Sequence, residues 1–523
     1  MKGFLQRFGH LVAGVLQGFD RMVLKGRLRQ LYTPEGMNCQ LSANHVLYKN
    51  FKSYAAEVTD RVLESSLVGE AKKADRFRYL NSSKTDKEAV ARELAAEHHI
   101  QSGLVCVLQC IEPCWTFDTA KTKDGLITVR GEPGKCSHLY HYYIHPQFGW
   151  MYVRLQTWFP FEIQVGLNGR EWLARQMDRE QLPYLRSDNK FLHIKDWQRA
   201  QQLMDQQLQT DWVRELDALQ QQVHPLHPRH LGRLPVKYNW TASQSEWATD
   251  IAFRSQDVLE RWFDRWLRQA VLSYDSIDIL RFFGRAQHSY PNRRMIIETN
   301  VHNHFEGKRI KHWAETNSLK LYIFFNILRP ETTINHAEKF RILRPSTNDP
   351  TGPATMRPMR RTVLDLPQRA TVSQNINERY LEALATTAET RTLKELAEPL
   401  TRRALEPRGK SGKPARQVRG LNPLAAEDAN LLTVISDPQW MINGLRNRDL
   451  VAALYKMPTE DAKEKRRRSA HVTRLLRLLR AHGLIQKIPQ THRYQLDSEA
   501  RTKIHALLAC RNANPDRLIT NAA

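Results

Sequence analysis

The chain has 523 residues, of which 41% are hydrophobic and 26% are charged, so we expect a folded protein of two to four domains. Its 79 Lys and Arg residues outnumber its 55 Asp and Glu residues, and the net charge of +24 favours a polyanionic partner such as DNA or RNA. A membrane span, a signal peptide and a disulfide framework are not expected, because long apolar runs are absent and cysteines are few. We therefore expect a cytoplasmic protein.

The first 225 residues predict a mixed α/β body with an antiparallel sheet. Residues 10–31 predict two short strands joined by a turn near Gly18, because glycine tolerates the backbone angles of turns. Residues 84–99 predict a helix, and the apolar run within 100–110 predicts a buried strand. Asp20 follows the first predicted strand, where an aspartate is a turn residue or, in nuclease-like folds, a metal ligand.

Residues 138–166 form the most aromatic stretch of the chain. Apolar and polar residues alternate in it as in strands of a sheet that has one solvent-exposed face. Exposed rings such as Tyr152 and Trp158, next to Arg154, would stack unpaired bases, and this predicts an RNA-binding protein as one alternative. The same alternation also arises when half of the rings belong to the core.

Three further divisions of the chain follow from its composition. Residues 226–345 predict a second α+β unit, which begins at a proline-broken linker, is helical over 243–286 and returns to strands after 294. Residues 346–420 predict a helical and basic linker region. Residues 421–523 predict a separate C-terminal domain.

The C-terminal part of the chain carries most of the excess charge. From residue 401 onward there are 24 Lys and Arg against 11 Asp and Glu, an excess of 13 positive charges in less than a quarter of the length. Such a concentration suits the neutralisation of DNA phosphates.

The order of predicted elements in this part is helix, helix, helix and hairpin. The helices are expected at Glu427–Ile435, Arg448–Tyr455 and Arg467–His482, with a short strand at Met441–Ile442. In the third helix Val472, Leu475, Leu476 and Leu479 share one face, while Arg467, Arg474 and Arg477 lie on the other. Gly483 ends this helix, and residues 484–496 predict a two-stranded hairpin with a polar tip at 489–492.

Together with the phrase Leu479-Arg480-Ala481-His482-Gly483-Leu484-Ile485, this order closely resembles winged-helix domains of the MarR- and ArsR-like kind. The resemblance implies a recognition helix at Ser469–Arg480 that enters the major groove and a wing at Lys487–Arg493 that touches the DNA backbone. It implies double-stranded DNA as the partner, and winged helices of this type often form homodimers. The alternative is a winged helix that makes protein contacts.

Candidate DNA-binding residues follow from the position of each in this motif. Arg474 and Arg477 are expected to contact guanine edges, whereas Arg466, Lys487 and Arg493 are expected to hold phosphates. The complete predicted set comprises Arg466, Arg467, Arg468, Ser469, His471, Arg474, Arg477, Lys487, Thr491, His492 and Arg493.

A group of cysteines and histidines lies between residues 106 and 145. Cys110, Cys114, Cys136 and His138 would supply four ligands of a tetrahedral Zn²⁺ site, although their spacing matches no common zinc finger. The alternative is that these cysteines are reduced and buried.

The stretch 298–331 gathers acidic, basic and tyrosine side chains. Glu298 and Glu331, with Lys320 nearby, would bind Mg²⁺ and activate water in a metal-dependent nuclease, and Tyr322 would be the nucleophile of a strand-transferase. The alternative is a second basic groove for nucleic acid.

Glycine-rich phosphate loops and a serine nucleophile elbow are absent from the sequence, which argues against an ATPase, a kinase, a dinucleotide enzyme or an α/β-hydrolase. The sequence thus predicts a DNA-binding protein whose C-terminal domain places a larger α+β body on duplex DNA. Control of transcription or replication, or a role in a mobile element, would fit this organisation.

Overall fold

The structure is a computed structural model, and it describes residues 1–225, 237–285, 296–304, 307–386, 393–405, 417–440, 444–455, 457–488 and 491–511. The chain divides into two compact units. Unit 1 comprises Met1–Arg285 and Ser289–Leu381, and unit 2 comprises Glu382–Ala523. One sheet runs through unit 1, so the segments expected to separate at residues 225 and 345 lie within a single unit.

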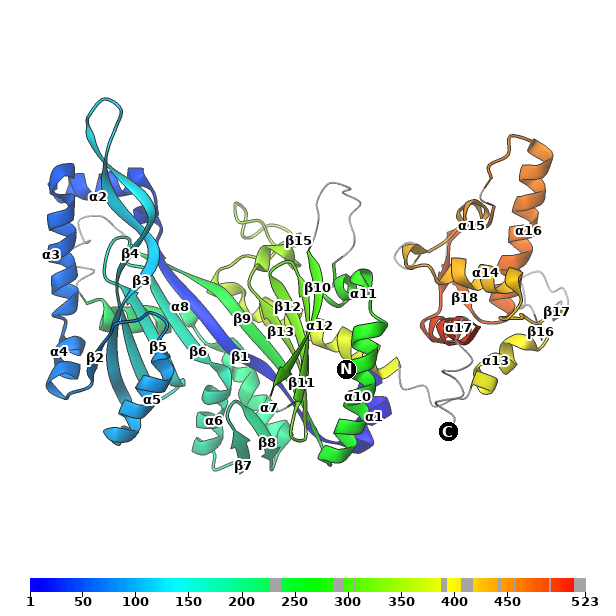
Figure 1. Cartoon of the computed structure of the whole chain (residues 1–523), viewed down its shortest axis with the longest axis horizontal. Coiled ribbons are helices and arrows are strands. Elements are labelled where there is room, and N and C mark those ends of the chain that lie inside the picture. Colours follow the sequence, from blue (N-terminus) through cyan, green and yellow to red (C-terminus); the bar gives the residue numbers. More distant parts are fainter. Residues whose placement is uncertain are drawn as a thin grey trace. The chain divides into compact units, whose positions relative to one another are not determined.

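The sheet of unit 1 has eleven strands in the order β10-β11-β12-β13-β9-β1-β6-β5-β4-β3-β2 (Figure 1). Neighbouring strands pair antiparallel except β2 and β3, which pair parallel. The mixed α/β class is as predicted, whereas a single large sheet that joins strands from both sides of residue 225 was not expected. The strands are β1 Val12–Leu28, β2 Phe77–Leu80, β3 Gly103–Lys121, β4 Ile127–His145, β5 Gly149–Gln156, β6 Ile163–Asn168, β9 Tyr238–Phe253, β10 Ile297–His304, β11 Gly307–Ala314, β12 Asn317–Phe324 and β13 Ile327–Ile334.

Strand β1 corrects the prediction of two short strands and a turn. It continues through Gly18 as one strand of 17 residues and pairs with β6 on one side and β9 on the other. Gly18 is needed for packing, because a Cβ atom there would lie 2.2 Å from the side chain of Met204. The glycine therefore reflects a close approach of another side chain and not a turn.

Helices cover both faces of this sheet. On one face α4, α6, α7 and α8 build the main apolar core with Val107, Leu139 and Val153, and on the other face α5 packs near Cys106 and Tyr140. The helices of unit 1 are α1 Lys2–Phe8, α2 Pro34–Ala43, α3 Phe51–Leu63, α4 Ser66–Lys73, α5 Lys87–Glu97, α6 Gly169–Arg179, α7 Trp197–Gln206, α8 Trp212–Val223, α10 Gln256–Leu272, α11 Ser276–Phe282 and α12 Leu366–Thr386. Two further ribbons are β7 Tyr184–Ser187 with β8 Lys190–Ile194, and β14 Arg341–Arg344 with β15 Thr355–Pro358.

One helix prediction in unit 1 needs correction and one is confirmed. Helix α7 ends at Gln206, and α8 begins after Asp211, whose side chain accepts a hydrogen bond from the backbone of Arg214. The block expected to be helical over 243–286 begins as strand β9 and becomes helical only at Gln256. The helix predicted at 84–99 is confirmed as α5, and the side chain of Asp86 caps it.

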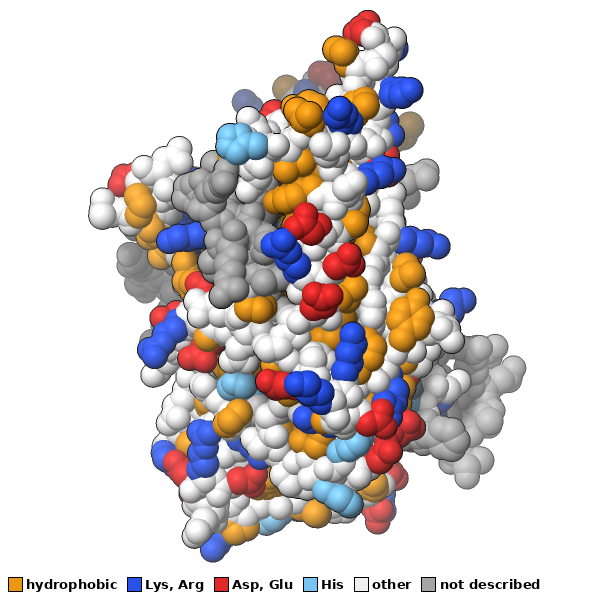
Figure 2. All heavy atoms as spheres, turned by 90° about the vertical axis from the view of Figure 1, so that its left-hand side faces the viewer, with side chains coloured by type: hydrophobic (Ala, Val, Ile, Leu, Met, Phe, Trp, Pro, Cys, Tyr) orange, Lys and Arg blue, Asp and Glu red, His pale blue; other side chains and the backbone are white. Residues whose placement is uncertain are grey.

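Charged side chains of both signs lie on the surface of unit 1. On the face that Figure 2 displays, basic and acidic side chains are interspersed. No helix within the described ranges is both long and apolar enough to cross a membrane.

Buried histidines give unit 1 an expected sensitivity to acid. Burial lowers the pKa values of His141 and His312 to about 4, against about 6.5 in an unfolded chain. Their contribution to stability is complete above pH 6.5 and is lost as the pH falls towards 4, because only the unfolded chain then binds the protons. The expected loss is roughly 1–3 kcal/mol for each histidine.

The measurement is urea unfolding at pH 7 and pH 4.5. His312→Asn should make the free energy of unfolding less dependent on pH than it is in the wild-type chain. Equal pH dependence in the variant and the wild-type chain would contradict this assignment.

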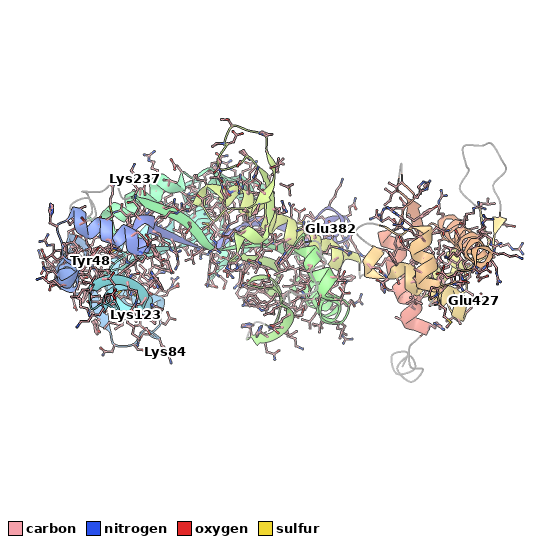
Figure 3. All side chains as sticks on the ribbon, turned by 90° about the horizontal axis from the view of Figure 1, so that it is seen from above. Tyr48, Lys84, Lys123, Lys237, Glu382 and Glu427 are labelled. Carbon is pink, nitrogen blue, oxygen red and sulfur yellow. The ribbon has the colours of Figure 1, made fainter. Side chains whose placement is uncertain are left out.

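Unit 2 contains five helices and two short ribbons within its described residues. Its elements are α13 Leu393–Thr401, β16 Ala404–Leu405, β17 Gln417–Val418, α14 Ala426–Ser436, α15 Asn447–Leu454, α16 Ala462–Ala481, β18 Ile485–Lys487, β19 Tyr494–Leu496 and α17 Ser498–Arg511. Strands β18 and β19 pair as an antiparallel hairpin. Figure 3 draws the described side chains of both units. It labels Glu382, which lies in α12, and Glu427, which lies in α14.

The three helices and the hairpin predicted for unit 2 are present at nearly the predicted positions. Val472, Leu476 and Leu479 are buried in a core of their own, together with Leu478. Leu475 was expected to be buried and is only partly so, although it packs against that core. The strand expected at Met441–Ile442 and the hairpin residues Pro489 and Gln490 lie outside the described residues.

Candidate functional site

Three carboxylates meet at the centre of the sheet of unit 1. Asp20 lies on β1, Glu246 on β9 and Glu331 on β13, and one carboxylate oxygen of each lies within 4.8 Å of the others. A β-bulge produces this arrangement. Phe19 pairs with Trp247 and Met22 with Ser245, so Asp20 and Arg21 both lie opposite Glu246.

Lys320 of β12 joins two of these carboxylates. Its Nζ atom lies 2.5 Å from Glu331 Oε1 and 3.3 Å from Glu246 Oε1. Lys320 and Glu331 are directly paired in the register of β12 and β13, which explains their contact. The arrangement of carboxylates beside a lysine can bind a divalent cation and a phosphate together.

A second group of charges lies deeper, next to this cluster. Arg329 is fully buried and donates hydrogen bonds to both oxygens of Asp250, to Asp20 Oδ2 at 3.2 Å and to the carbonyl oxygen of Asn189 at 3.0 Å. Arg170 of α6 adds an ion pair with Asp250 at 3.0 Å. Asp20 Oδ1 is buried and has no hydrogen-bond partner among the described residues.

The two groups of charges separate the pKa values of the carboxylates. Burial raises the pKa of Asp20 to about 6, and the neighbouring carboxylates add to this rise while Arg329 opposes it. Burial and Glu331 also raise the pKa of Glu246. For Glu331 burial acts in the same direction, but Lys320 and Arg329 outweigh it and lower the pKa to about 2. Glu331 is therefore an anion at neutral pH, and the other two carboxylates accept protons more easily.

Four predicted catalytic candidates separate into two groups in the structure. Lys320, Tyr322 and Glu331 come together, and the buried Tyr322 hydroxyl donates to Glu331 Oε2 at 2.9 Å. Because that hydroxyl is enclosed, its position suits a support for Glu331 better than a nucleophile. Glu298 is exposed on β10, where it pairs with Trp313 of β11, and lies outside the carboxylate group.

A hollow of about 710 Å³ borders the cluster through Glu246. Residues of β5, β6, β1 and β9 line it, together with residues of α5, of α6 and of the β7–β8 ribbon. Aromatic rings line it at Trp150, Tyr152 and Tyr184. Its ionic lining has four carboxylates (Glu88, Glu171, Asp188, Glu246) against three arginines (Arg21, Arg92, Arg186), so a divalent cation would reverse its charge.

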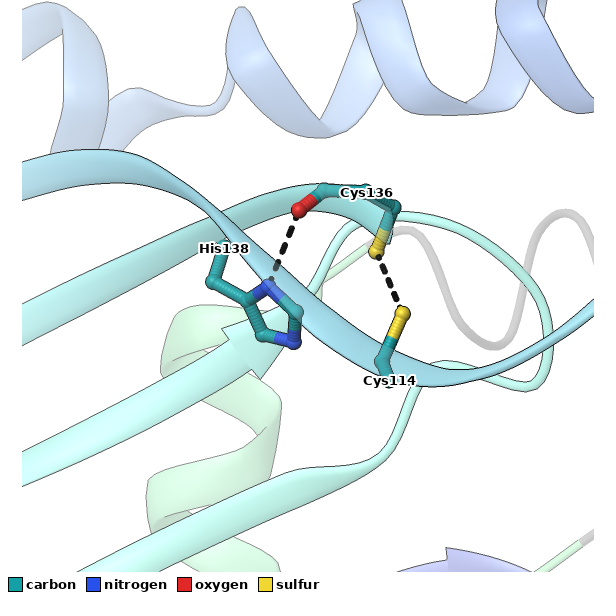
Figure 4. Close-up of side chains that lie close together, drawn as sticks. All are labelled: Cys114, Cys136 and His138. Atoms are coloured by element: carbon teal, nitrogen blue, oxygen red, sulfur yellow. Dashed lines mark hydrogen bonds between the residues drawn. The ribbon is translucent and has the colours of Figure 1, made fainter. Parts of the chain in front are cut away.

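The predicted zinc ligands converge in part. Cys114 of β3 and Cys136 of β4 place their Sγ atoms 3.4 Å apart, and His138 lies beside them, with one ligand atom of each residue within 4.8 Å of the others (Figure 4). Cys110 lies outside this group, because its thiol donates to Glu112 Oε1 at 3.4 Å.

In unit 2 the exposed face of α16 carries a row of cations. Arg466, Arg467, Arg474 and Arg477 are exposed, and among the described residues the only ion pair recorded for these four joins Arg467 to Glu464 at 3.5 Å. The opposite face supplies the apolar core of the unit. The sequence periodicity had therefore divided this helix correctly into a buried and an exposed face.

Other predicted residues of α16 hold α15 in place. Ser469 and Asn447 exchange hydrogen bonds of 3.0 Å, and His471 Nδ1 lies 2.7 Å from the hydroxyl oxygen of Tyr455. The guanidinium group of Arg468 lies 4.8 Å from the centre of the Tyr455 ring and donates to the carbonyl oxygen of Met457 at 2.6 Å. These side chains already have partners within the unit.

The predicted wing residues differ in exposure. Lys487 and His492 are exposed, whereas Thr491 and Arg493 are partly buried. The hydroxyl of Thr491 donates to the carbonyl oxygen of Ile488, and Arg493 contacts the carbonyl oxygen of Gly444 at 3.4 Å. Of Lys487 and Arg493, Lys487 is thus the one whose side chain is exposed.

The sequence did not point to Glu246, Asp250, Arg170 or Arg329. Each occurs as a single charge within an ordinary strand or helix pattern. Strand pairing brings Glu246, Asp250 and Arg329 close to Asp20, and the packing of α6 on the sheet adds Arg170. Besides Asp20, Lys320 and Glu331, which the sequence did suggest, the charge of Arg329 inside an otherwise apolar run is a signal that could have marked this region.

Comparison with known proteins gives no relative for this chain. No family model matches it, and neither a curated protein nor a solved structure is significantly similar.

Proposed function

We propose that the chain binds double-stranded DNA through unit 2, which acts as a winged helix with α16 in the major groove and the β18–β19 hairpin on the backbone. The observation that carries this proposal is the row of Arg466, Arg467, Arg474 and Arg477 on the solvent face of α16. Exposed guanidinium groups on one helix face suit guanine edges and phosphates, and the apolar side of the helix holds it in place.

The arrangement of α15 against α16 supports the same proposal. The contacts of Asn447 and Tyr455 with α16 fix the orientation of the helix, so its arginines are presented from a rigid element. Lys487 lies on the adjoining hairpin at the position where a wing contacts a phosphate.

The direct test is a titration of labelled 30-base-pair duplex DNA with the full chain, followed by fluorescence anisotropy. We expect binding that weakens steeply as salt rises, with single-stranded RNA of the same length a poorer competitor than duplex DNA. Absence of salt-sensitive duplex binding would contradict the proposal. A preference for the RNA would also contradict it and would favour RNA binding by the aromatic sheet of unit 1.

A second candidate function is the metal-dependent hydrolysis of a phosphodiester at the cluster of Asp20, Glu246 and Glu331. It is favoured by the convergence of three carboxylates and Lys320 beside a hollow with aromatic and arginine lining. In this reaction Mg²⁺ or Mn²⁺ would lie on the carboxylates and lower the pKa of a bound water. The water oxygen would bond to phosphorus while one phosphorus–oxygen ester bond breaks, the water would lose a proton, and the leaving oxygen would take one up.

The expected result is cleavage of supercoiled plasmid by the full chain with Mg²⁺ or Mn²⁺. Glu246→Gln should reduce the rate by about a hundredfold or more, because it removes one of three cation ligands. Glu298→Gln should retain the wild-type rate, since that exposed glutamate lies outside the cluster. A plasmid that stays intact with the wild-type chain, or equal rates in the two variants, would contradict this function.

A further inference from the structure

We propose that Cys114, Cys136 and His138 form a Zn²⁺ site between strands β3 and β4, with the fourth coordination position left for a water molecule. This site is separate from the carboxylate cluster and from the DNA-binding face of α16. It uses three of the four ligands that the sequence suggested and excludes Cys110.

The distance between the two sulfur atoms suits a shared metal ion. Two zinc–sulfur bonds of about 2.3 Å at a tetrahedral angle place the sulfurs about 3.8 Å apart, and the observed separation is 3.4 Å. A disulfide would require about 2.05 Å, so the two thiols are not joined to each other. A slightly larger separation of the two sulfur atoms is sufficient for both of them to bind the ion.

The histidine provides an independent indication. His138 is fully buried, and its Nδ1 atom lies 3.1 Å from the carbonyl oxygen of Cys136. A carbonyl oxygen can only accept, so Nδ1 carries the proton and Nε2 carries the lone pair. Nε2 is buried and has no hydrogen-bond partner among the described residues.

This is the pattern in which a histidine ligates zinc through one nitrogen while the other nitrogen donates to the backbone. Figure 4 shows the imidazole next to the two sulfur atoms, with the Cys136 carbonyl oxygen on its other nitrogen. Without a metal ion the lone pair of Nε2 would be buried and unsatisfied, which is unfavourable.

The net charge of the complex also favours Zn²⁺ as the ion bound at this site. Zn²⁺ with two thiolates and a neutral imidazole is neutral overall, so the complex can lie in a largely buried position. Cysteine and histidine ligands select zinc over magnesium or calcium, which prefer oxygen. A site with three protein ligands and an open position differs from the closed four-ligand sites of zinc fingers.

The test is the metal content of the full chain, purified without chelator and measured by plasma mass spectrometry. We expect about one zinc ion per chain in the wild type and near-complete loss in Cys114→Ala and His138→Gln. Cys106→Ala is the matched control, because this buried cysteine lies on the same strand outside the group, and it should retain the metal. Full zinc content in Cys114→Ala would overturn the proposal.

Thiol alkylation of the wild-type chain gives a second readout that does not depend on a variant folding. With zinc bound, Cys114 and Cys136 should be protected and should become reactive after treatment with EDTA, while the exposed Cys39 reacts in both conditions. Equal reactivity before and after EDTA, or a Cys114–Cys136 disulfide in the purified protein, would overturn the proposal.

Discussion

If unit 2 binds DNA as proposed, replacement of Arg474 and Arg477 by alanine is expected to remove most of the preference of the chain for a selected duplex site. Both side chains are exposed on α16, and a good arginine contact with a guanine edge contributes about 1–3 kcal/mol of discrimination. Loss of both should weaken the affinity for a preferred site by roughly a hundredfold or more. The measurement is anisotropy titration of the full chain at fixed salt, with a selected site and a scrambled duplex of the same composition.

The matched controls separate sequence reading from charge. Arg511→Ala removes an exposed arginine at the end of α17 and should leave the affinity nearly unchanged. Lys487→Ala should weaken binding to both duplexes equally, because a phosphate contact is independent of sequence. Arg474→Ala alone should weaken the selected site more than the scrambled one. Equal losses for Arg474→Ala and Lys487→Ala on both duplexes would contradict the assigned roles.

Arg329→Met is expected to be the most destabilising single change in unit 1. It leaves the buried carboxylates of Asp20 and Asp250 without their principal cation, and removal of one partner from a buried ion pair costs about 3–5 kcal/mol. Arg170 still pairs with Asp250, so the loss should fall within that range and not exceed it. Urea unfolding at pH 7, monitored by tryptophan fluorescence, measures the effect.

Arg361→Met is the matched control for this prediction. Arg361 pairs with Glu338, but the two side chains are 46% and 45% exposed, so the pair should contribute less than about 1 kcal/mol. A similar unfolding midpoint for the two variants would show that the buried network contributes little to stability.

The sequence predicted unit 2 better than unit 1, for a physical reason. The faces of α16 depend on residues three and four positions apart, so Val472, Leu476 and Arg474 could be assigned from local spacing alone. The contacts of Ser469 with Asn447 and of His471 with Tyr455, and the half-buried state of Leu475, depend on tertiary packing, which local spacing does not include.

In unit 1 the candidate sites depend on pairing between distant strands. Lys320 and Glu331 were both chosen from their clustering in sequence, and the register of β12 and β13 does bring them together. Glu246 and Asp20 join them only because β9 and β1 lie next to β13 in the sheet and β1 contains a bulge. No local sequence pattern specifies that order of strands. The predicted catalytic residues therefore included Glu298, which lies outside the cluster, and did not include Glu246, which belongs to it.

The salt dependence of duplex DNA binding tests the central claim most directly. For the full chain, the slope of the logarithm of the association constant against the logarithm of salt concentration should be steep, since each neutralised phosphate contributes about 0.9 to it. Removing Lys487 and Arg466, the predicted phosphate contacts, should make the slope shallower by about two. An unchanged slope in that double variant would contradict the proposal that α16 and its hairpin bind the DNA.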